Sequence, residues 1–268
     1  MNGINDILKQ IISRARFFHT KEEWLDYRKT GVNGTDLSKI TGSSGYGDKL
    51  DVLKSKLGMD DDSKSNINAI EDISEETSDL ELKEALPRLL GHELEDFLIS
   101  IYKRRVPSCK EIITYDMVDE YSVEWVFTHP EYDFIKGSYD GIAVYENGDI
   151  GILEIKTALG FSQKNWNEGV PSYYREQGEH YLLSCPEASF VDFIALLGNN
   201  KIGIYRIYAN PERMEEIFKI ESEFWDEVLK YKSEETMIIP VNAKPKAEKP
   251  IDDESFEFED LDREMYEK

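Results

Sequence analysis

The sequence is short of cysteine, of long apolar runs and of basic residues, and each shortage narrows the class of protein. Its two cysteines, Cys109 and Cys185, cannot supply the four thiolates of an iron–sulfur nuclease, and in a reduced cytosol we expect them to be inert. No stretch approaches 18 consecutive apolar residues, so the sequence predicts no membrane span. The first residues show no signal-peptide pattern, and we therefore predict a cytoplasmic protein.

Basic residues are outnumbered, 32 against 55 acidic ones, and the net charge of −23 should repel DNA phosphates. Two segments, residues 60–84 and 251–268, together carry −15 of this charge and leave −8 on the other 225 residues. A locally basic groove or bound divalent cations could then be enough for DNA. The charge argues against a nucleic-acid coat protein, but not against an enzyme with a small, metal-loaded site.

Apolar residues at helical spacing predict helices in the first part of the chain. We expect helices over Ile4–Phe18 and Glu22–Lys29, and a short one that ends at Ile40 after a glycine-containing turn. A long helix is expected from about Glu84 to Arg104.

The apolar stripe of this long helix consists of Leu90, Leu94, Phe97, Leu98 and Ile101. At 100° per residue, Glu95 falls on one flank of the stripe and Glu93 on the other. A carboxylate on either flank would lie at the rim of the core and could still reach a site.

Farther along the chain the apolar period changes to two, which predicts strands. The expected strands cover residues 112–115, 124–127, 141–145, 150–155, 190–197 and 203–207. Helices are expected over residues 172–184 and 211–231. These elements predict an α/β fold with a central mixed, twisted sheet and helices on both faces. We expect residues 1–240 to form one domain with a mobile acidic insert at 59–84, followed by a linker and a disordered acidic tail at 241–268.

The candidate chemistry lies in Asp140 and in the sequence Glu154-Ile155-Lys156. Residues two apart share one face of a strand, so Glu154 and Lys156 should point together while Leu153 and Ile155 point into the core. Magnesium prefers carboxylate oxygens, and phosphodiester hydrolysis is helped by a cation near the attacking water. A surface ion pair worth under ~1 kcal/mol is the alternative explanation of the same pattern.

The hairpin between Asp140 and Lys156 sets a geometric condition on this site. Asn147-Gly148 predicts a two-residue loop, and that loop would place Asp140 opposite Ile155, on the wrong face. A metal site therefore requires a bulge or bend near Gly141, or a three-residue loop, that moves Asp140 beside Glu154.

Five motifs in order, over roughly residues 20–200, resemble those of the YqaJ-type viral recombinase family, the relatives of phage lambda exonuclease within the PD-(D/E)xK nuclease superfamily. They are Trp24 to Arg28 with Gly31 to Asp36, Gly91 with Glu95, His129 with Ser138 to Gly141, Leu153 to Thr157, and Trp166 with Pro171, Gln177 and Tyr181. Tyr139 stands where the family usually has proline, and Asn33 where it more often has glycine. Neither departure is expected to touch a proposed ligand.

The resemblance implies a restriction-endonuclease-like core and a magnesium-dependent exonuclease, with manganese able to substitute, that digests double-stranded DNA ends from the 5′ side. It also implies phage or prophage recombination beside a single-strand annealing protein, often as a homo-oligomer, a trimeric ring. Carried onto matching positions, the metal ligands would be Asp140, Glu154, Glu95 and the backbone carbonyl of Ile155. Lys156 would orient or activate the water and stabilise charge on the phosphate, Gln177 and Tyr181 would line the site, and Arg28, Thr35 and Ser138 would hold a phosphate.

Alternatives stay open at this point. Glu95 could be only a solvated helix flank, with Glu93 as the ligand, Arg28 could be a structural ion-pair partner, and Gln177 could simply bond backbone. Tyr181 is expected first in packing. An endonuclease with the same chemistry, or a non-catalytic DNA-end-binding scaffold, would share the motifs; the intact set of Asp140, Glu154 and Lys156 argues against the scaffold.

Overall fold

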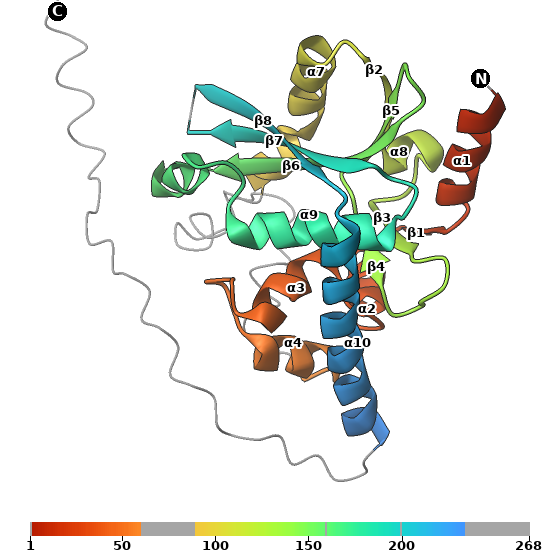
Figure 1. The fold of residues 1–268 in the computed structure, drawn as a ribbon, viewed down its shortest axis with the longest axis vertical. Coiled ribbons are helices and arrows are strands. Elements are labelled where there is room, and N and C mark those ends of the chain that lie inside the picture. Colours follow the sequence, from red (N-terminus) through yellow and green to blue (C-terminus); the bar gives the residue numbers. More distant parts are fainter. Residues whose placement is uncertain (1, 60–88, 159, 199, 234–268) are drawn as a thin grey trace, which may run out of the picture. The chain divides into compact units, whose positions relative to one another are not determined.

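The computed structural model describes residues 2–59, 89–158, 160–198 and 200–233. Met1–Met237 form one compact unit, and its described residues contain a five-stranded sheet in the order β2-β5-β6-β7-β8 (Figure 1). β6 and β7 are parallel, and the other neighbours are antiparallel, so the sheet is mixed as predicted. Apart from residue 59, the predicted acidic insert lies outside the described residues, as do the linker and the tail.

The strands of this sheet lie close to their predicted positions. They are β2 (Cys109–Ile113), β5 (Gly141–Tyr145), β6 (Ile150–Ala158), β7 (Phe190–Leu197) and β8 (Lys201–Tyr208). Nearly every residue of β5, β6 and β7 is buried, as expected for strands with neighbours on both sides and covered faces, whereas β8 at the edge is largely half-buried or exposed.

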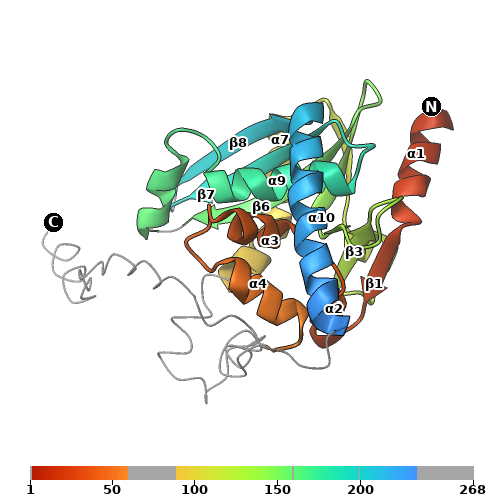
Figure 2. The ribbon, with the colours of Figure 1, turned by 60° about the horizontal axis from the view of Figure 1, so that its bottom comes forward.

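Helices cover both faces of the five-stranded sheet (Figures 1 and 2). Helix α9 (Ser172–Ser184) packs on one face, where Tyr181 and Leu182 join the core cluster that contains Ile152. Helix α7 (Glu95–Arg105) packs on the other face, in the cluster that contains Leu153 and Ile155. Because neighbouring residues of β6 point to opposite faces, Glu154 and Lys156 lie on the side of α9.

A second sheet of three strands was not predicted. Its order is β1-β3-β4, with β1 at Ala15–Phe18, β3 at Glu124–Thr128 and β4 at Lys136–Gly137. The prediction of one helix over Ile4–Phe18 is therefore wrong in its last part: α1 is Asn2–Ile12, and the chain then pairs with β3 as a strand. Pairing with a distant strand overrides the local helical spacing, and the adjacent Phe17 and Phe18 suit a strand.

The predicted long helix is interrupted. Residues 89–93 are helical, Leu94 is in a turn, and α7 begins only at Glu95. Leu98 is fully buried as expected, and Leu94 and Ile101 pack against the same core cluster. Phe97, at the edge of the predicted stripe, is 51% exposed. Residues 84–88, where this helix was expected to begin, lie outside the described residues.

Four further helices pack beside the sheets. They are α2 (Lys21–Arg28), α3 (Gly34–Thr41), α4 (Lys49–Lys56) and α10 (Pro211–Ser233). Of these, α4 was not predicted; it begins with a capping box at Asp48 and buries Val52 and Leu53 against Phe224 and Val228 of α10. Short helical segments also occur at α8 (Tyr115–Val118) and η1 (Gly160–Trp166). None of the helices in the described ranges is both long and apolar enough to cross a membrane.

Candidate active site

The hairpin of β5 and β6 has the register that the proposed site requires. Gly141 pairs with Leu153, and the ladder continues without a shift to Val144 and Ile150. The predicted two-residue loop is wrong: the backbone of Tyr145 bonds that of Asp149, which leaves a three-residue loop ending in Gly148 at φ +94°. Because Gly141 pairs with Leu153, the residue before Gly141 lies across from the residue after Leu153. Asp140 is therefore placed across from Glu154. The alternative condition, a three-residue loop that moves Asp140 beside Glu154, is confirmed.

Glu154 is the centre of a buried polar cluster on β6. Its Oε1 accepts hydrogen bonds from Lys156 Nζ at 2.5 Å and from Gln177 Nε2 at 2.7 Å. Gln177 also donates to the hydroxyl of Tyr181 at 2.7 Å, so it bonds two side chains of the site rather than backbone. The second carboxylate oxygen of Glu154 is buried and has no hydrogen-bond partner in the described part of the chain.

The ammonium of Lys156 lies between the carboxylates and an aromatic ring. Burial by itself would lower the pKa of Lys156, but Glu154 and Asp140 raise that pKa above its ordinary value. The Nζ atom also lies 4.8 Å from the ring centre of Tyr174, which adds a cation–π contact. Lys156 is therefore held as a cation beside two acidic side chains.

The carboxyl groups around Glu154 repel one another. Burial and the charge of Asp140 raise the pKa of Glu154 to about 8. Burial likewise raises the pKa of Asp140, although Lys156 opposes this, and Asp140 Oδ2 accepts a hydrogen bond from the backbone N–H of Ile155. Burial and the charges of Asp140, Glu124 and Glu154 raise the pKa of Glu95 to about 9. Such crowding of acidic groups is typical of functional sites.

Glu95 therefore belongs to this group, whereas Glu93 is exposed to solvent. Glu95 is the first residue of α7, and its carboxylate also lies 3.4 Å from Nδ1 of the exposed His92. The geometry favours Glu95 over Glu93 as the acidic residue that the long helix contributes.

Glu124 is a further member that the sequence did not reveal. It is the first residue of β3, and burial and the charge of Asp140 raise its pKa to about 7, while Arg28 and Lys21 lower it. No motif marks it, because its place depends on how the three-stranded sheet meets the hairpin. A single carboxylate at the start of an apolar strand was the only available signal.

These raised values predict a fall in stability as pH rises. The pKa values of Glu124, Glu154 and Glu95 lie at about 7, 8 and 9 in the folded chain, against 4.5 for the ordinary side chain. Between pH 4.5 and these raised pKa values, the folded chain therefore holds more protons than the unfolded chain. The free energy of unfolding decreases as pH rises above about 4.5, until pH has passed the folded-state pKa values. We expect the thermal unfolding midpoint in chelator to fall between pH 5 and pH 9, and Mg²⁺ at pH 8 to raise it again.

Glu95→Gln should reduce both the fall of the unfolding midpoint with pH and its rise when Mg²⁺ is added. Glu93→Gln should leave both effects unchanged. Equal behaviour of the two variants would contradict the placement of Glu95 in the site.

Arg28 and Thr35 come together beside the carboxylate cluster. Arg28 Nη2 donates to Thr35 Oγ1 at 3.1 Å, and the guanidinium carbon lies 4.5 Å from the ring centre of Trp24. Trp24 Nε1 donates to Ser138 Oγ at 3.3 Å, which brings Ser138 into the same group. Arg28 is also near enough to Glu124 to lower its pKa, and it makes no ion pair in the described residues. The structure thus gathers all three residues that the resemblance assigns to a phosphate.

Gly34 allows α3 to approach α9 closely. A Cβ atom at this position would lie 2.5 Å from Cε1 of Tyr181 and 3.1 Å from Cγ of Gln177. Only hydrogen fits in this space, and the close approach places the first turn of α3, with Thr35, beside the two residues of α9 that line the site.

We therefore expect Gly34→Ala to destabilise the chain by about 1–3 kcal/mol, the usual cost of overpacking, and to displace Gln177 from Glu154. Thermal unfolding measures the first effect. Gly45→Ala is the matched control, because a Cβ there would have nothing within 4 Å. Equal midpoints for the two variants would contradict the close approach.

The two positions that depart from the family pattern contact residues beside the proposed ligands rather than the ligands themselves. The ring of Tyr139 packs edge-on against Tyr181, with ring centres 4.9 Å apart. The side-chain amide of Asn33 donates to the backbone carbonyl of Arg28 at 2.8 Å. Both contacts join segments that are distant in sequence or lie across a turn, so the motif spacing did not predict them.

The donor chemistry of this site fits a divalent cation. Within the described ranges, no group of three or more histidine, cysteine, aspartate or glutamate side chains is arranged to hold a metal ion. Magnesium, however, keeps several waters and is often bound through one or two carboxylates together with substrate phosphates. The unpartnered, buried Oε2 of Glu154 and the raised pKa values around it are what an acidic pair without its counter-ion should show.

The fold and the site define a protein with a mixed α/β core and a buried acidic cluster at the end of a hairpin, and the chain belongs to the YqaJ-like viral recombinase domain family. The family model matches residues 23–186, more than half of the chain and the whole range of the five motifs. The protein YqaJ of Bacillus subtilis is 29% identical over 210 residues, which are 78% of this chain and 56% of that relative. The chain thus spans little more than half the length of the relative.

Solved structures of the alkaline exonuclease LHK-Exo from Laribacter hongkongensis share the fold. The crystal structure of LHK-Exo is 18% identical with a TM-score of 0.54, and its complex with dAMP is 20% identical with the same score. Each match covers 78% of this chain and 93% of the other chain.

Proposed function

We propose that this protein is a magnesium-dependent exonuclease that hydrolyses the phosphodiester bonds of duplex DNA ends from 5′ to 3′ in phage-type recombination. The observation that carries the proposal is the hairpin register, which brings Asp140 beside Glu154 and Lys156 on one face of the sheet. Membership of a viral recombinase family and the fold shared with an alkaline exonuclease support it.

Asp140, Glu154 and Glu95, with the backbone carbonyl of Ile155, would hold the magnesium, and manganese should substitute. Bound magnesium would act as a Lewis acid toward the phosphate and would lower the pKa of a water molecule. Lys156 would orient that water and stabilise negative charge that develops on the phosphate, since its ammonium is held as a cation by Glu154. Gln177 would fix Glu154 through its hydrogen bond and, with Tyr181, would line the site.

Arg28, Thr35 and Ser138 would bind the terminal 5′-phosphate. The guanidinium is suited to this because it can donate two hydrogen bonds to one phosphate, and it is held between Trp24 and Thr35 without a carboxylate partner in the described residues. Thr35 lies in the first turn of α3, where the helix dipole favours an anion. A 5′-phosphate bound there would set the distance from the DNA end to the reacting bond.

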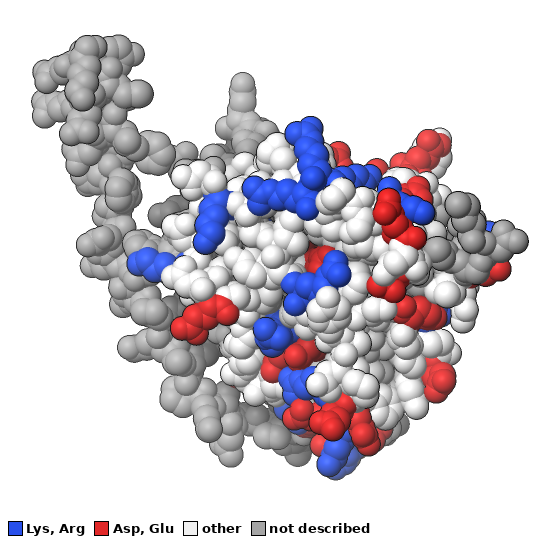
Figure 3. Space-filling model, turned by 45° about the horizontal axis from the view of Figure 1, so that its top comes forward, with Lys and Arg blue, Asp and Glu red and all other residues white. Residues whose placement is uncertain are grey.

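The surface offers basic regions in spite of the net charge of −23. Figure 3 shows a face on which lysine and arginine side chains run across the upper part, and acidic and basic side chains alternate below. Helix α7 ends in three basic residues that are all exposed, Lys103, Arg104 and Arg105. Regions of this kind can follow a duplex backbone, because contacts with phosphates release bound counter-ions.

The direction of digestion is tested with linear duplexes that carry a label at the 5′ or the 3′ end. The proposal predicts early release of the 5′ label as a mononucleotide in the presence of magnesium, with the 3′ label retained in long fragments. Cleavage of a closed circular duplex at a comparable rate would instead indicate an endonuclease.

We also propose that the protein works as a homo-oligomer, a trimeric ring as the family resemblance implies, and beside a single-strand annealing protein. Sedimentation of the full chain should give three times the mass of 31.1 kDa. A monomer at micromolar concentration, with full activity, would contradict the ring.

A further inference from the structure

Lys56 is a buried lysine that no motif contains. It is the last residue of α4, and its side chain is 4% exposed. Its ammonium contacts the Asp36 carboxylate at 2.6 Å and donates to the backbone carbonyl of Arg28 at 3.0 Å. Lysine is almost never fully buried unless it is paired, so the position needs a reason.

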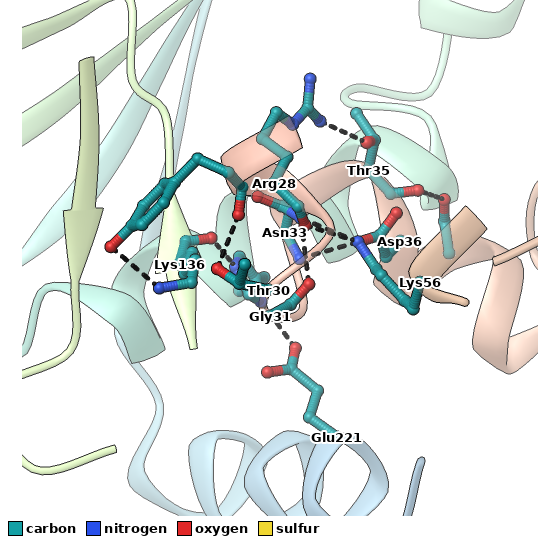
Figure 4. Close-up of polar contacts among 12 residues, drawn as sticks. Arg28, Thr30, Gly31, Asn33, Thr35, Asp36, Lys56, Lys136 and Glu221 are labelled. Carbon is teal, nitrogen blue, oxygen red and sulfur yellow. Dashed lines mark hydrogen bonds and ion pairs between the residues drawn. The ribbon is translucent and has the colours of Figure 1, made fainter. Parts of the chain in front are cut away.

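The carbonyl of Arg28 stands at the end of α2, where helix carbonyls have no partner within the helix. It accepts two hydrogen bonds here, from Lys56 Nζ and from the side-chain amide of Asn33 at 2.8 Å. Asp36 Oδ2 binds both of these donors: it contacts Lys56 Nζ and accepts from the side-chain amide of Asn33 at 3.2 Å. It also accepts from the backbone N–H of Asn33 at 2.9 Å. Figure 4 shows these contacts converging below the guanidinium of Arg28.

The turn that follows Arg28 is also fixed from the opposite side. The backbone N–H of Val32 donates to the carbonyl of Phe134 at 2.6 Å, and the carbonyl of Val32 accepts from the N–H of Lys136, the first residue of β4, at 2.9 Å. The chain between α2 and α3 is thus held by β4 on one side and by Lys56 on the other. Its two ends carry Arg28 and Thr35, whose side chains meet at 3.1 Å.

The electrostatics of the pair agree with this geometry. Burial alone would raise the pKa of Asp36, but Lys56, and in smaller part Arg28, lower it to about 2. Asp36 therefore stays ionised at neutral pH, and its charge opposes the lowering of the Lys56 pKa that burial causes. A buried ion pair is weak evidence for stability as such, since apolar residues of similar size can do as well. In this structure the ion pair fixes the position of the Arg28 backbone.

We propose that Lys56, with Asp36, is a positioning residue of the 5′-phosphate site: it holds the backbone of Arg28 so that the guanidinium and Thr35 meet at the DNA end. The inference rests on the proposed function. Lys56 touches no substrate, and its contribution is expected in the preference for 5′-phosphorylated ends rather than in the hydrolysis of the bond.

The test measures the ratio of digestion rates of the full chain on linear duplexes with 5′-phosphate and 5′-hydroxyl ends. Lys56→Met alone leaves Asp36 buried without its partner and could unfold the chain, so the informative variant is the double change Lys56→Met with Asp36→Asn. The amide oxygen that Asp36→Asn introduces can still accept from the backbone N–H and the side-chain amide of Asn33. The double change therefore removes the ion pair as a whole and, with it, the ammonium at the Arg28 carbonyl, and leaves no unpaired buried charge. Arg28→Met defines the ratio without the guanidinium.

Two control variants separate the positioning role of Lys56 from a general loss of stability. Lys54→Met changes an exposed lysine of the same helix, and Val228→Ala weakens the apolar cluster that packs α4 without a polar contact to Arg28. We expect the double variant to lose about tenfold in the end-preference ratio, comparable to the loss of one charge-assisted hydrogen bond, with little change in the rate on hydroxyl ends. Both controls should keep the wild-type ratio.

Each other outcome overturns a defined part of the account. A folded double variant that keeps the ratio while Arg28→Met loses it removes the role of Lys56 alone. An equal loss in Val228→Ala shows that any loosening of α4 suffices and also removes it. A wild type that digests both ends equally overturns the phosphate roles of Arg28 and Lys56 together, and a wild type that digests no DNA overturns the proposed function with them.

Discussion

Replacing Lys156 by alanine is expected to lower the rate of duplex digestion by about 10²–10³-fold while the chain remains folded. The ammonium is the only cation bonded to Glu154 among the described residues, and loss of one group that stabilises transition-state charge costs about 2.7–4 kcal/mol. The fold should tolerate the change, because Glu154, whose pKa is already about 8, can take up a proton once Lys156 no longer lowers it.

The measurement is the initial rate at saturating magnesium, together with the thermal unfolding midpoint. Lys201→Ala is the control, since it removes an exposed lysine of β8, the edge strand, and keeps the same net charge as the variant. Full activity of the Lys156 variant would contradict the proposed mechanism.

Asp140→Asn is expected to abolish digestion and at the same time to stabilise the chain. The asparagine Oδ1 can still accept the hydrogen bond from the Ile155 N–H, while the buried charge that repels Glu154 and Glu95 disappears. Burial raises the pKa of Asp140 in the folded chain, so its ionised form opposes folding at every pH above the ordinary value of 3.8, and the substitution removes that cost. Strain of this kind is retained at sites that need it for function.

Thermal unfolding at pH 8 in chelator should show a higher midpoint, by ~2–4 °C for each kcal/mol gained in a domain of this size. Asp149→Asn, at the exposed residue that follows the loop of the same hairpin, should leave both midpoint and activity unchanged. A lower midpoint for Asp140→Asn would mean that the aspartate is structural.

Much of the fold was predictable because its elements are locally regular. β5, β7 and α9 have the predicted bounds. The short apolar run of β5, the apolar residues of β7 on both sides of Asp192 and the start of α9 after Pro171 are all signals that act over a few neighbouring residues. The hairpin loop shows the limit of such signals. Asn147-Gly148 suits a two-residue turn, yet Gly148 at φ +94° serves equally well as the left-handed residue that ends a three-residue loop.

The parts that escaped prediction depend on contacts between distant segments. Glu124 and Lys56 reach their places through the second sheet and through α4, and neither has a neighbour in sequence that marks it. The break at Leu94 and the strand after α1 likewise follow from packing against other elements. Residues of the five motifs were found because the resemblance already joins segments that the fold brings together.

The central claim is that Asp140, Glu154 and Lys156 form a magnesium-dependent nuclease site. Its most direct test is digestion of a linear, 5′-phosphorylated duplex by the purified full chain, in magnesium and in chelator, beside the Glu154→Gln variant. A site of this kind should release mononucleotides steadily in magnesium and none in chelator, and the variant should release none. Nucleotide release that persists in chelator, or a Glu154→Gln variant as active as the wild type, would contradict it.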